Sequence, residues 1–216
     1  IGTDCSGIEA PIEAMNKISC KYNINFKHMF SSEIDKFAIK YIKTNHNPEY
    51  LFNDIKNRNI NDVPDIDIYV AGFPCQPYSR ANKFKLEVDP RTDLFHDCAK
   101  VIHERQPKIF ILENVKTLVT LRDGYYFDKI LESLNKNNKY HIHYKIINSK
   151  DYGIPQCRER LYIIGISREH SKDILCSDIL TTPALSLLAD VRSQKINNLA
   201  SQDRFSKSGS AQMVGP

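Results

Sequence analysis

One of the chain's six cysteines lies between two prolines, in the segment Gly72–Ser79 with the sequence GFPCQPYS. A strand-like run, Asp67–Ala71, comes directly before this segment. Because proline fixes its own backbone torsion, we expect the thiol of Cys75 to be held rigidly where the strand ends. A thiol held in this way can act as a nucleophile, since attack on carbon requires a fixed orientation. A lone cysteine is more often a buried structural residue, but the whole segment favours the nucleophile.

A carboxylate and two arginines are placed where they could assist such a thiol. Glu113 ends the strand-like run 108–113, and a carboxyl group there can hold or transfer a proton. Arg158 and Arg160 precede the apolar run 161–166. On an extended backbone, side chains two residues apart point to the same side, so both guanidinium groups can address one anionic or carbonyl-rich target. The plainer alternatives are a helix-cap neighbour for Glu113 and a solvated basic edge for the arginines.

Polar residues in the first quarter of the chain could bind a nucleoside. The segment 3–11 (TDCSGIEAP) contains one glycine, at which a backbone can approach a ligand closely. Glu33 follows that glycine at a spacing at which nucleotide-binding folds hold ribose hydroxyls, and Asp54 follows a further strand-like run. Each carboxylate could instead belong to a helix cap or a turn. Their joint placement favours a cofactor that contains a nucleoside.

Short strand-like runs alternate with helix-like segments along most of the chain. This alternation predicts an α/β fold with a mostly parallel sheet and helices on both faces. Ligands bind at the carboxyl ends of the strands in such sheets, and most of the residues named above lie at those ends. We expect strands at 1–5, 27–33, 50–53, 66–71, 108–113, 140–147 and 161–166, and helices at 10–18, 36–45, 94–105 and 126–135.

The composition is that of an ordinary globular domain, with 41% hydrophobic and 26% charged residues in a chain of 216. The net charge of +4 agrees with a polyanionic partner, although many proteins without one are equally basic. The cysteines form no CxxC pair and no metal-ligand spacing. We therefore expect reduced thiols, no metal, and an intracellular rather than a secreted protein, in the cytoplasm, nucleoid or nucleus. No apolar stretch is long enough to span a bilayer, so no membrane partner is expected.

Three short blocks occur in a fixed order: Pro-Cys-Gln after one strand, Glu-Asn-Val at the end of the next, and Gln-x-Arg-x-Arg before a later one. Over about 1–191, this pattern resembles the DNA (cytosine-5) methyltransferases. The resemblance implies a Rossmann-like methyltransferase fold with S-adenosyl-L-methionine as the cofactor. The chain departs from the family pattern at Cys5, where the family carries Phe, and at Glu9, where it carries the second glycine of its cofactor loop. It departs again at Thr92, where the family carries Gly.

The resemblance also implies roles for individual residues. Cys75 would add to C6 of a cytosine, and Glu113 would bond N3 and the exocyclic amine. Arg160 would contact O2, and Arg158 would position the base or a phosphate. The residues implied in cofactor binding are Cys5, Ser6, Gly7, Ile8, Glu33, Ile34, Asp54, Ile55, Gly72, Pro74 and Leu94. The residues implied in DNA binding belong to a loop that closes over DNA in the family, and they are Gln76, Ser79, Arg80 and Lys83.

The implied reaction transfers a methyl group from S-adenosyl-L-methionine to C5 of cytosine in double-stranded DNA. Addition of the thiolate of Cys75 at C6 makes C5 nucleophilic, S-adenosyl-L-homocysteine is the product, and no metal is required. Stacking shields C6 inside a duplex, so the base must be flipped out. Two alternatives stay open: methylation of cytosine in RNA such as tRNA, and a non-catalytic, methyltransferase-like DNA-binding subunit. Restriction-modification is one biological role that such an enzyme could serve.

The sequence divides into a catalytic, S-adenosylmethionine-binding domain at 1–180 and a second region at 181–216. The strand and helix pattern weakens after 166, and small polar residues are frequent in 193–216. We expect 181–216 to be a linker and the truncated start of a target-recognition region. The family normally continues with the rest of that region and further C-terminal blocks. The chain is therefore expected to be a fragment, or to be completed by a second polypeptide that supplies these parts.

Overall fold

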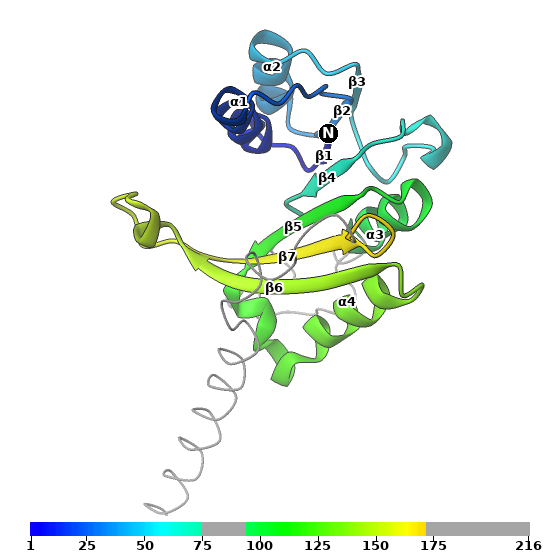
Figure 1. The fold of residues 1–216 in the computed structure, drawn as a ribbon, viewed down its shortest axis with the longest axis vertical. Helices are drawn as coiled ribbons and strands as arrows, with labels where there is room; N and C mark the ends of the chain where they lie inside the picture. Colours follow the sequence, from blue (N-terminus) through cyan, green and yellow to red (C-terminus); the bar gives the residue numbers. More distant parts are fainter. Residues whose placement is uncertain (75–93, 172–216) are drawn as a thin grey trace, which may run out of the picture. The chain divides into compact units, whose positions relative to one another are not determined.

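The computed structural model describes residues 1–74 and 94–171, which all lie within one compact unit, Ile1–Leu175. Four α-helices and seven strands are formed by these residues (Figure 1). Their order along the chain is β1 Gly2–Asp4, α1 Ala10–Tyr22, β2 Phe30–Ser32, α2 Lys36–Asn45, β3 Tyr50–Phe52, β4 Ile68–Ala71, α3 Leu94–Arg105, β5 Ile109–Val115, α4 Tyr125–Asn135, β6 Tyr140–Asn148 and β7 Glu159–Ser167.

The described strands form one seven-stranded sheet in the order β3-β2-β1-β4-β5-β7-β6. The first five strands in this order pair in parallel, and β7 runs antiparallel to both of its neighbours. Strands β2 and β3 lie on one side of β1 in the sheet, and β4 and β5 lie on its other side. Right-handed crossovers in the two directions place α1 and α2 on one face and α3 on the opposite face. The predicted α/β fold with a mostly parallel sheet is confirmed.

The reversal of strand order falls between β1 and β4. Adjacent parallel strands whose connections leave in opposite directions open a crevice at their carboxyl ends, and ligands bind in such crevices. The loops that follow β1 and β4 therefore form the expected ligand site of this sheet. They are the segments that carry Gly7 and Pro74.

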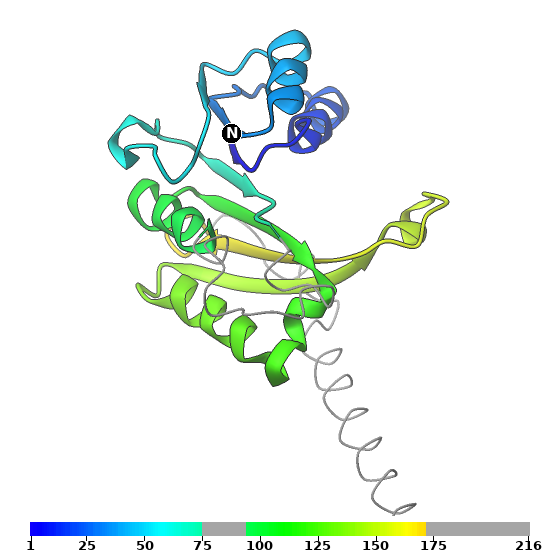
Figure 2. The ribbon, with the colours of Figure 1, turned by 180° about the vertical axis from the view of Figure 1, so that it is seen from behind.

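The centre of the sheet is packed with aromatic side chains. Phe30, Tyr69 and Phe110 are fully buried, and α3 and α4 pack against each other beside β6 (Figure 2). Gly165 in β7 lies directly against the ring of Phe110: a Cβ at this position would come within 2.0 Å of Phe110 Cε1. Glycine is therefore needed at position 165 by the close approach of a ring.

Several elements differ in length from those expected. The helix α1 continues to Tyr22, because it ends only where Asn23 adopts the left-handed conformation (φ 52°) and its N–H bonds to Ser19 O. The strand β7 begins at Glu159, because pairing with β5 and β6 recruits residues that precede the apolar run. The expectation that Arg160 precedes the strand is therefore wrong, since it lies within the strand.

Two helices have the bounds expected from the sequence. The helix α2 begins after Asp35, whose carboxylate accepts hydrogen bonds from the N–H groups of Phe37 (3.0 Å) and Ala38 (2.8 Å). The helix α3 starts at Leu94 and buries one apolar stripe against the sheet. None of the described helices is long and apolar enough to cross a membrane. The expected boundary at 180 and the polar region 193–216 lie outside the described residues.

We predict that Gly165→Ala lowers the free energy of unfolding by about 1–3 kcal/mol, because the added methyl group displaces the Phe110 ring from a filled core. Urea unfolding followed by circular dichroism measures the change. Ser167→Ala, on the same strand, is the control and should leave the midpoint almost unchanged. An unchanged midpoint for Gly165→Ala would contradict the packing described here.

Candidate active site

The loop after β1 is folded tightly against the end of β2. Cys5, Gly7 and Glu9 all adopt left-handed backbone conformations, with φ of 51°, 55° and 64°. Ser6 N donates to Ser32 O (3.1 Å), and Ser32 N donates to Ser6 Oγ (3.0 Å). A Cβ at Gly7 would have no neighbour within 4 Å, so open space borders the loop at this point. The loop is pinned on its inner side and open on its outer side.

Glu33 connects the end of β2 to this loop. Its Oε2 accepts a hydrogen bond from Gly7 N (2.8 Å), and its Oε1 accepts from the N–H groups of Ile34 (2.8 Å) and Asp35 (2.9 Å). Each carboxylate oxygen can accept more than one hydrogen bond, so hydroxyl groups of a ligand can still be bound. Ile8 and Ile34 expose 59% and 71% of their surface beside the carboxylate. An acceptor flanked by exposed apolar side chains suits a ribose that carries a flat ring.

Asp54 is a turn residue whose carboxylate is already engaged locally. Its Oδ1 accepts from Lys56 N (3.0 Å), and its Oδ2 accepts from Asn57 Nδ2 (2.9 Å). The neighbouring Ile55 is buried. Asp54 also lies near enough to Cys5 for its charge to act on the thiol. The structure therefore places Asp54 within range of the loop after β1. It also confirms the alternative interpretation from the sequence, in which Asp54 belongs to a turn.

Cys5 is a neutral packing residue in this setting. Burial, followed by the negative charges of Asp4 and Glu33, raises the pKa of the Cys5 thiol to about 12. A thiol with such a pKa carries no thiolate at neutral pH, so it is no nucleophile. Cys5 is compatible with a role in lining the loop, where a small apolar side chain is sufficient.

A buried ion pair holds the end of β1 in place. The Arg58 guanidinium bonds both carboxylate oxygens of Asp4, with Nη1–Oδ1 at 2.7 Å and Nη2–Oδ2 at 2.8 Å. Tyr69 OH donates to Asp4 Oδ2 (2.7 Å). The guanidinium carbon lies 5.1 Å and 5.0 Å from the ring centres of Phe30 and Phe52. The sequence analysis missed this pair, because Arg58 lies in a polar segment that resembles an ordinary turn.

The strand order reverses between β1 and β4. On the β4 side of this reversal, β5 and β7 place the carboxylate of Glu113 beside the guanidinium of Arg160. Arg160 Nε lies 3.0 Å from Glu113 Oε1, and both side chains remain partly exposed. Tyr162 stands opposite Glu113 in the ladder. Burial and then the charge of Glu113 raise the pKa of Tyr162, whereas the charges of Arg158 and Arg160 lower it. The structure thus groups the three predicted residues Glu113, Arg158 and Arg160 around Tyr162, which sequence reasoning missed.

The segment that leads to Cys75 is anchored beside this group. Asn114 is buried, and its Nδ2 donates to Phe73 O (3.1 Å). A Cβ at Gly72 would lie 3.6 Å from Glu113 Oε2. The backbone of residues 72–74 therefore runs past the Glu113 carboxylate. In the sequence, Asn114 was identified only as the middle residue of the Glu-Asn-Val block. Its hydrogen bond to Phe73 O anchors the segment that leads to Cys75.

The remaining predicted residues have a less complete description. Pro74 is half-buried and is the last residue described before the gap, and Leu94 is the half-buried first residue of α3. Predicted residues that lie outside the described part of the chain are Cys75, Gln76, Ser79, Arg80 and Lys83.

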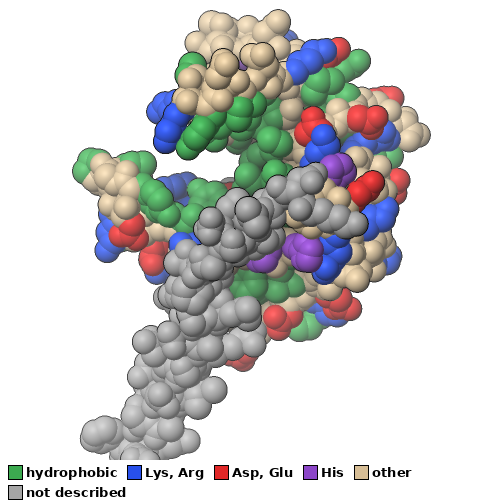
Figure 3. Space-filling model, in the orientation of Figure 1, with side chains coloured by type: hydrophobic (Ala, Val, Ile, Leu, Met, Phe, Trp, Pro, Cys, Tyr) green, Lys and Arg blue, Asp and Glu red, His purple; other side chains and the backbone are tan. Residues whose placement is uncertain are grey.

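The hairpin between β6 and β7 projects from the body of the described residues. Figure 3 shows apolar and charged side chains exposed along it. Tyr152 and Ile154 near its tip expose 66% and 52% of their surface, and Arg158 is exposed where it rejoins the sheet. The hairpin therefore presents an apolar surface with charges of both signs next to the Glu113–Arg160 pair.

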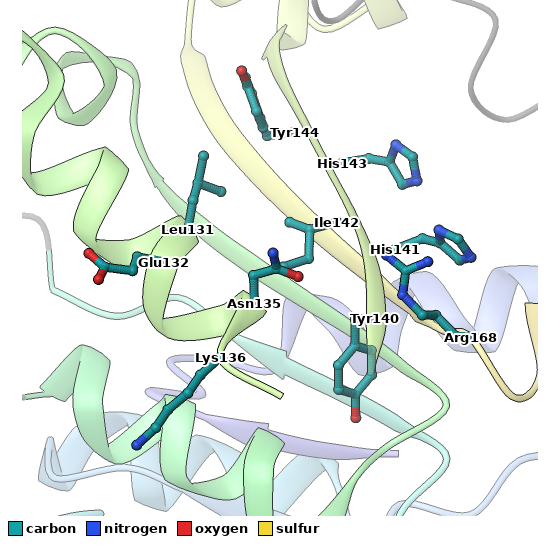
Figure 4. A pocket seen from close by; sticks show the side chains of 10 residues that line it. All are labelled: Leu131, Glu132, Asn135, Lys136, Tyr140, His141, Ile142, His143, Tyr144 and Arg168. Carbon is teal, nitrogen blue, oxygen red and sulfur yellow. The ribbon is translucent and has the colours of Figure 1, made fainter. Parts of the chain in front are cut away.

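A pocket of about 680 Å³ lies at the opposite edge of the sheet, between α4 and the first half of β6 (Figure 4). Tyr140 pairs with Ser167, so this half of β6 is level with the start of β5 and not with Glu113. The pocket has no part in the candidate site. Its lining residues are Leu131, Glu132, Asn135, Lys136, Tyr140, His141, Ile142, His143, Tyr144 and Arg168.

We predict that Arg58→Met lowers the free energy of unfolding by about 3–5 kcal/mol, because it leaves the buried carboxylate of Asp4 without its partner. Lys129→Met is the matched control, since it breaks an exposed pair with Glu132 and should cost about 1 kcal/mol or less. Chemical denaturation of both variants measures the difference. Equal costs for the two variants would show that the buried pair does not hold β1.

The sheet order, with the loop after β1 bonded to a carboxylate that follows β2, is that of a Rossmann-like α/β fold. Comparison with known proteins gives the family. The model of the C-5 cytosine-specific DNA methylase family matches residues 4–211, and the chain belongs to this family.

Curated relatives are bacterial enzymes. The chain is 46% identical over 143 residues to the Type II methyltransferase M1.ScrFI of Lactococcus lactis subsp. cremoris, covering 66% of the chain and 36% of the relative. It is 45% identical over 140 residues to the Type II methyltransferase M.NgoBI of Neisseria gonorrhoeae, covering 65% of the chain and 44% of that relative. The chain thus spans less than half the length of these relatives.

Solved structures agree with the fold. The methyltransferase EhMeth of Entamoeba histolytica matches with a TM-score of 0.59 and 25% identity, over 76% of this chain and 52% of that one. The Dnmt2 methyltransferase of S. pombe matches with a TM-score of 0.58 and 23% identity, over 77% of this chain and 50% of that one. The second likeness concerns the fold alone.

Proposed function

We propose that the chain carries the catalytic part of a DNA (cytosine-5-)-methyltransferase, which methylates C5 of a flipped-out cytosine in double-stranded DNA. The observation that carries the proposal is the pairing of Glu113 with Arg160, beside the anchored segment that leads to Cys75. Family membership supports the same reaction.

The residues around the loop after β1 fit S-adenosyl-L-methionine. Open space at Gly7 lies next to the Glu33 carboxylate, which can accept the ribose hydroxyls. Ile8 and Ile34 can cover the adenine, and Asp54 and Ile55, which follow β3, would contact its edge. Cys5, Ser6, Gly72, Pro74 and Leu94 would complete the site. The bound cofactor supplies an electrophilic methyl group and leaves as S-adenosyl-L-homocysteine.

Glu113 and Arg160 are suited to hold a cytosine by its polar edge. A carboxyl group that keeps or shares a proton can bond N3 and the exocyclic amine, which favours charge developing on the ring. The guanidinium of Arg160, held by Glu113, can donate to O2. Arg158, exposed at the start of β7, would hold the base or a phosphate. Together these groups prepare C6 for attack.

The proposed covalent step belongs to Cys75. Its thiolate forms a bond to C6, and the electron pair of the C5–C6 double bond becomes available at C5 for the methyl group. Loss of the C5 proton as the Cys75–C6 bond breaks then restores the aromatic ring. Gln76, Ser79, Arg80 and Lys83 would contact the DNA around the extruded base.

We predict that the whole protein of which this chain carries the catalytic part, incubated with S-adenosyl-L-methionine and duplex DNA containing 5-fluorocytosine, forms a covalent complex stable to denaturing electrophoresis. Fluorine cannot leave as the proton does, so the adduct through Cys75 persists. Cys75→Ala should abolish the complex, whereas Cys157→Ala, which removes an exposed cysteine, should retain it.

Three outcomes of this trapping experiment would contradict the proposal. A complex that survives Cys75→Ala assigns the nucleophile elsewhere. Trapping of cytosine in tRNA but not in DNA supports the RNA alternative. Binding of DNA without any adduct supports the non-catalytic alternative.

We predict that Glu113→Gln lowers the rate of methyl transfer by about 10²–10⁴-fold, because the amide cannot share a proton with N3. S-adenosylhomocysteine binding should be unchanged, since Glu33 and not Glu113 lies at the cofactor loop. Glu159→Gln is the matched control: it removes a carboxylate on the same strand as Arg160 that pairs with Lys116 instead. Comparable rates for the two variants would remove Glu113 from the chemistry.

A further inference from the structure

Glu9 is a fully buried carboxylate at a position where its backbone is strained. Its exposed fraction is 0%, and its φ of 64° lies in the left-handed region that favours glycine. It is also the position at which the sequence departs from the glycine of the family loop. Burial of a charge and a left-handed backbone both oppose folding, so the contacts of this side chain must offset both.

The Glu9 carboxylate is hydrogen-bonded to side chains of two neighbouring strands, β1 and β2. Glu9 Oε1 accepts hydrogen bonds from Thr3 Oγ1 of β1 (2.6 Å) and from Ser31 Oγ of β2 (2.5 Å). Thr3 Oγ1 is also 2.8 Å from Ser6 Oγ, which bonds the backbone of Ser32. One side chain thus fixes the spacing between the loop after β1 and the end of β2. These are the two segments that present Gly7 and Glu33.

A histidine extends the cluster behind the loop. The single hydroxyl hydrogen of Ser31 goes to Glu9, so the contact of 2.9 Å between Ser31 Oγ and His28 Nε2 requires the imidazole to donate. His28 Nε2 also lies 3.5 Å from Glu9 Oε1. His46 lies edge-on to His28, and Glu13 approaches His46 at 3.8 Å. Burial raises the pKa of Glu9, but the bonds from His28, Ser31 and Thr3 outweigh it and leave the pKa below its ordinary value.

We propose that Glu9 is a positioning residue for the cofactor: its buried carboxylate clamps the loop after β1 to the end of β2 and so sets the distance between Gly7 and Glu33. The inference rests on the proposed function, because it assigns the cofactor to these two segments. In this chain the hydrogen bonds of Glu9 hold the loop in the conformation that a second glycine supports in the family pattern. The loop is held from behind by a side chain, while its outer face stays open.

The test compares two substitutions of the same residue. Glu9→Gly removes the clamp and relieves the strained backbone, so the fold is kept while the loop is released. Glu9→Gln retains an acceptor oxygen for Thr3 and Ser31. Isothermal titration with S-adenosylhomocysteine should show affinity weakened about tenfold or more in Glu9→Gly and within about threefold of the parent in Glu9→Gln. In methylation assays, Glu9→Gly should raise KM for S-adenosylmethionine more than it lowers kcat.

Two further variants keep the result interpretable. Glu13→Gln changes an exposed carboxylate one turn along α1 and should leave the affinity unchanged. Ser31→Ala removes one of the two hydroxyl donors to Glu9 without touching the strained residue, and it should weaken binding by a smaller factor. If circular dichroism shows that Glu9→Gly fails to fold, Ser31→Ala provides the test of the proposal in its place.

The outcomes separate the inference from the proposed function. If the parent chain binds S-adenosylhomocysteine and folded Glu9→Gly binds equally well, the clamp is refuted and the cofactor assignment stands. The same conclusion follows if Ser31→Ala is folded and binds like the parent. If the parent chain binds no S-adenosylhomocysteine, the cofactor assignment fails and the inference fails with it.

Discussion

The buried pair between Asp4 and Arg58 is the contact on which the rest of the site depends. β1 has only three residues and lies in the sheet between β2 and β4, where the strand order reverses. Its carboxyl end carries a negative charge with no exposure to solvent, and the guanidinium held between Phe30 and Phe52 neutralises it. Because Arg58 comes from the segment after β3, the pair ties the outer strand to the centre. The loop that begins at Cys5 therefore starts from a fixed point.

The second half of the site is built by strand register rather than by a loop. Val115 pairs with Arg160 and Glu113 with Tyr162, so the carboxylate and the guanidinium lie on the same face of one antiparallel ladder, two rungs apart. Side chains on strands are positioned more rigidly than those on loops, which suits the proposed contact of these two groups with the edge of a base. Asn114, on the opposite face of β5, uses the same register to hold the backbone of Phe73.

The fold class was predicted well from the sequence, because the spacing of apolar residues and the polar residues after each strand can be recognised within short segments of the chain. The ranges of α2 and α3 were predicted fully, and Glu33 was correctly placed at the end of β2, whereas Glu113 and Arg160 lie within β5 and β7. The partners of these residues were not predicted, because they depend on which strands become neighbours. Arg58 looked like a turn residue and Tyr162 like a core residue. Glu9 was noticed only as a missing glycine, since nothing local shows that Thr3 and Ser31 converge on it.

The reversed direction of β7 has a consequence for whatever is joined after it. Arg160 enters the ladder at the end of the sheet where the base would be held, but the strand then runs seven residues further to Ser167 at the far end. That path is roughly 22–24 Å at the rise of an extended chain. A segment that leaves from Ser167 and reads bases beside Glu113 must travel back over this whole distance. The attachment point of any such segment is thus remote from the Glu113–Arg160 pair, at the opposite end of β7.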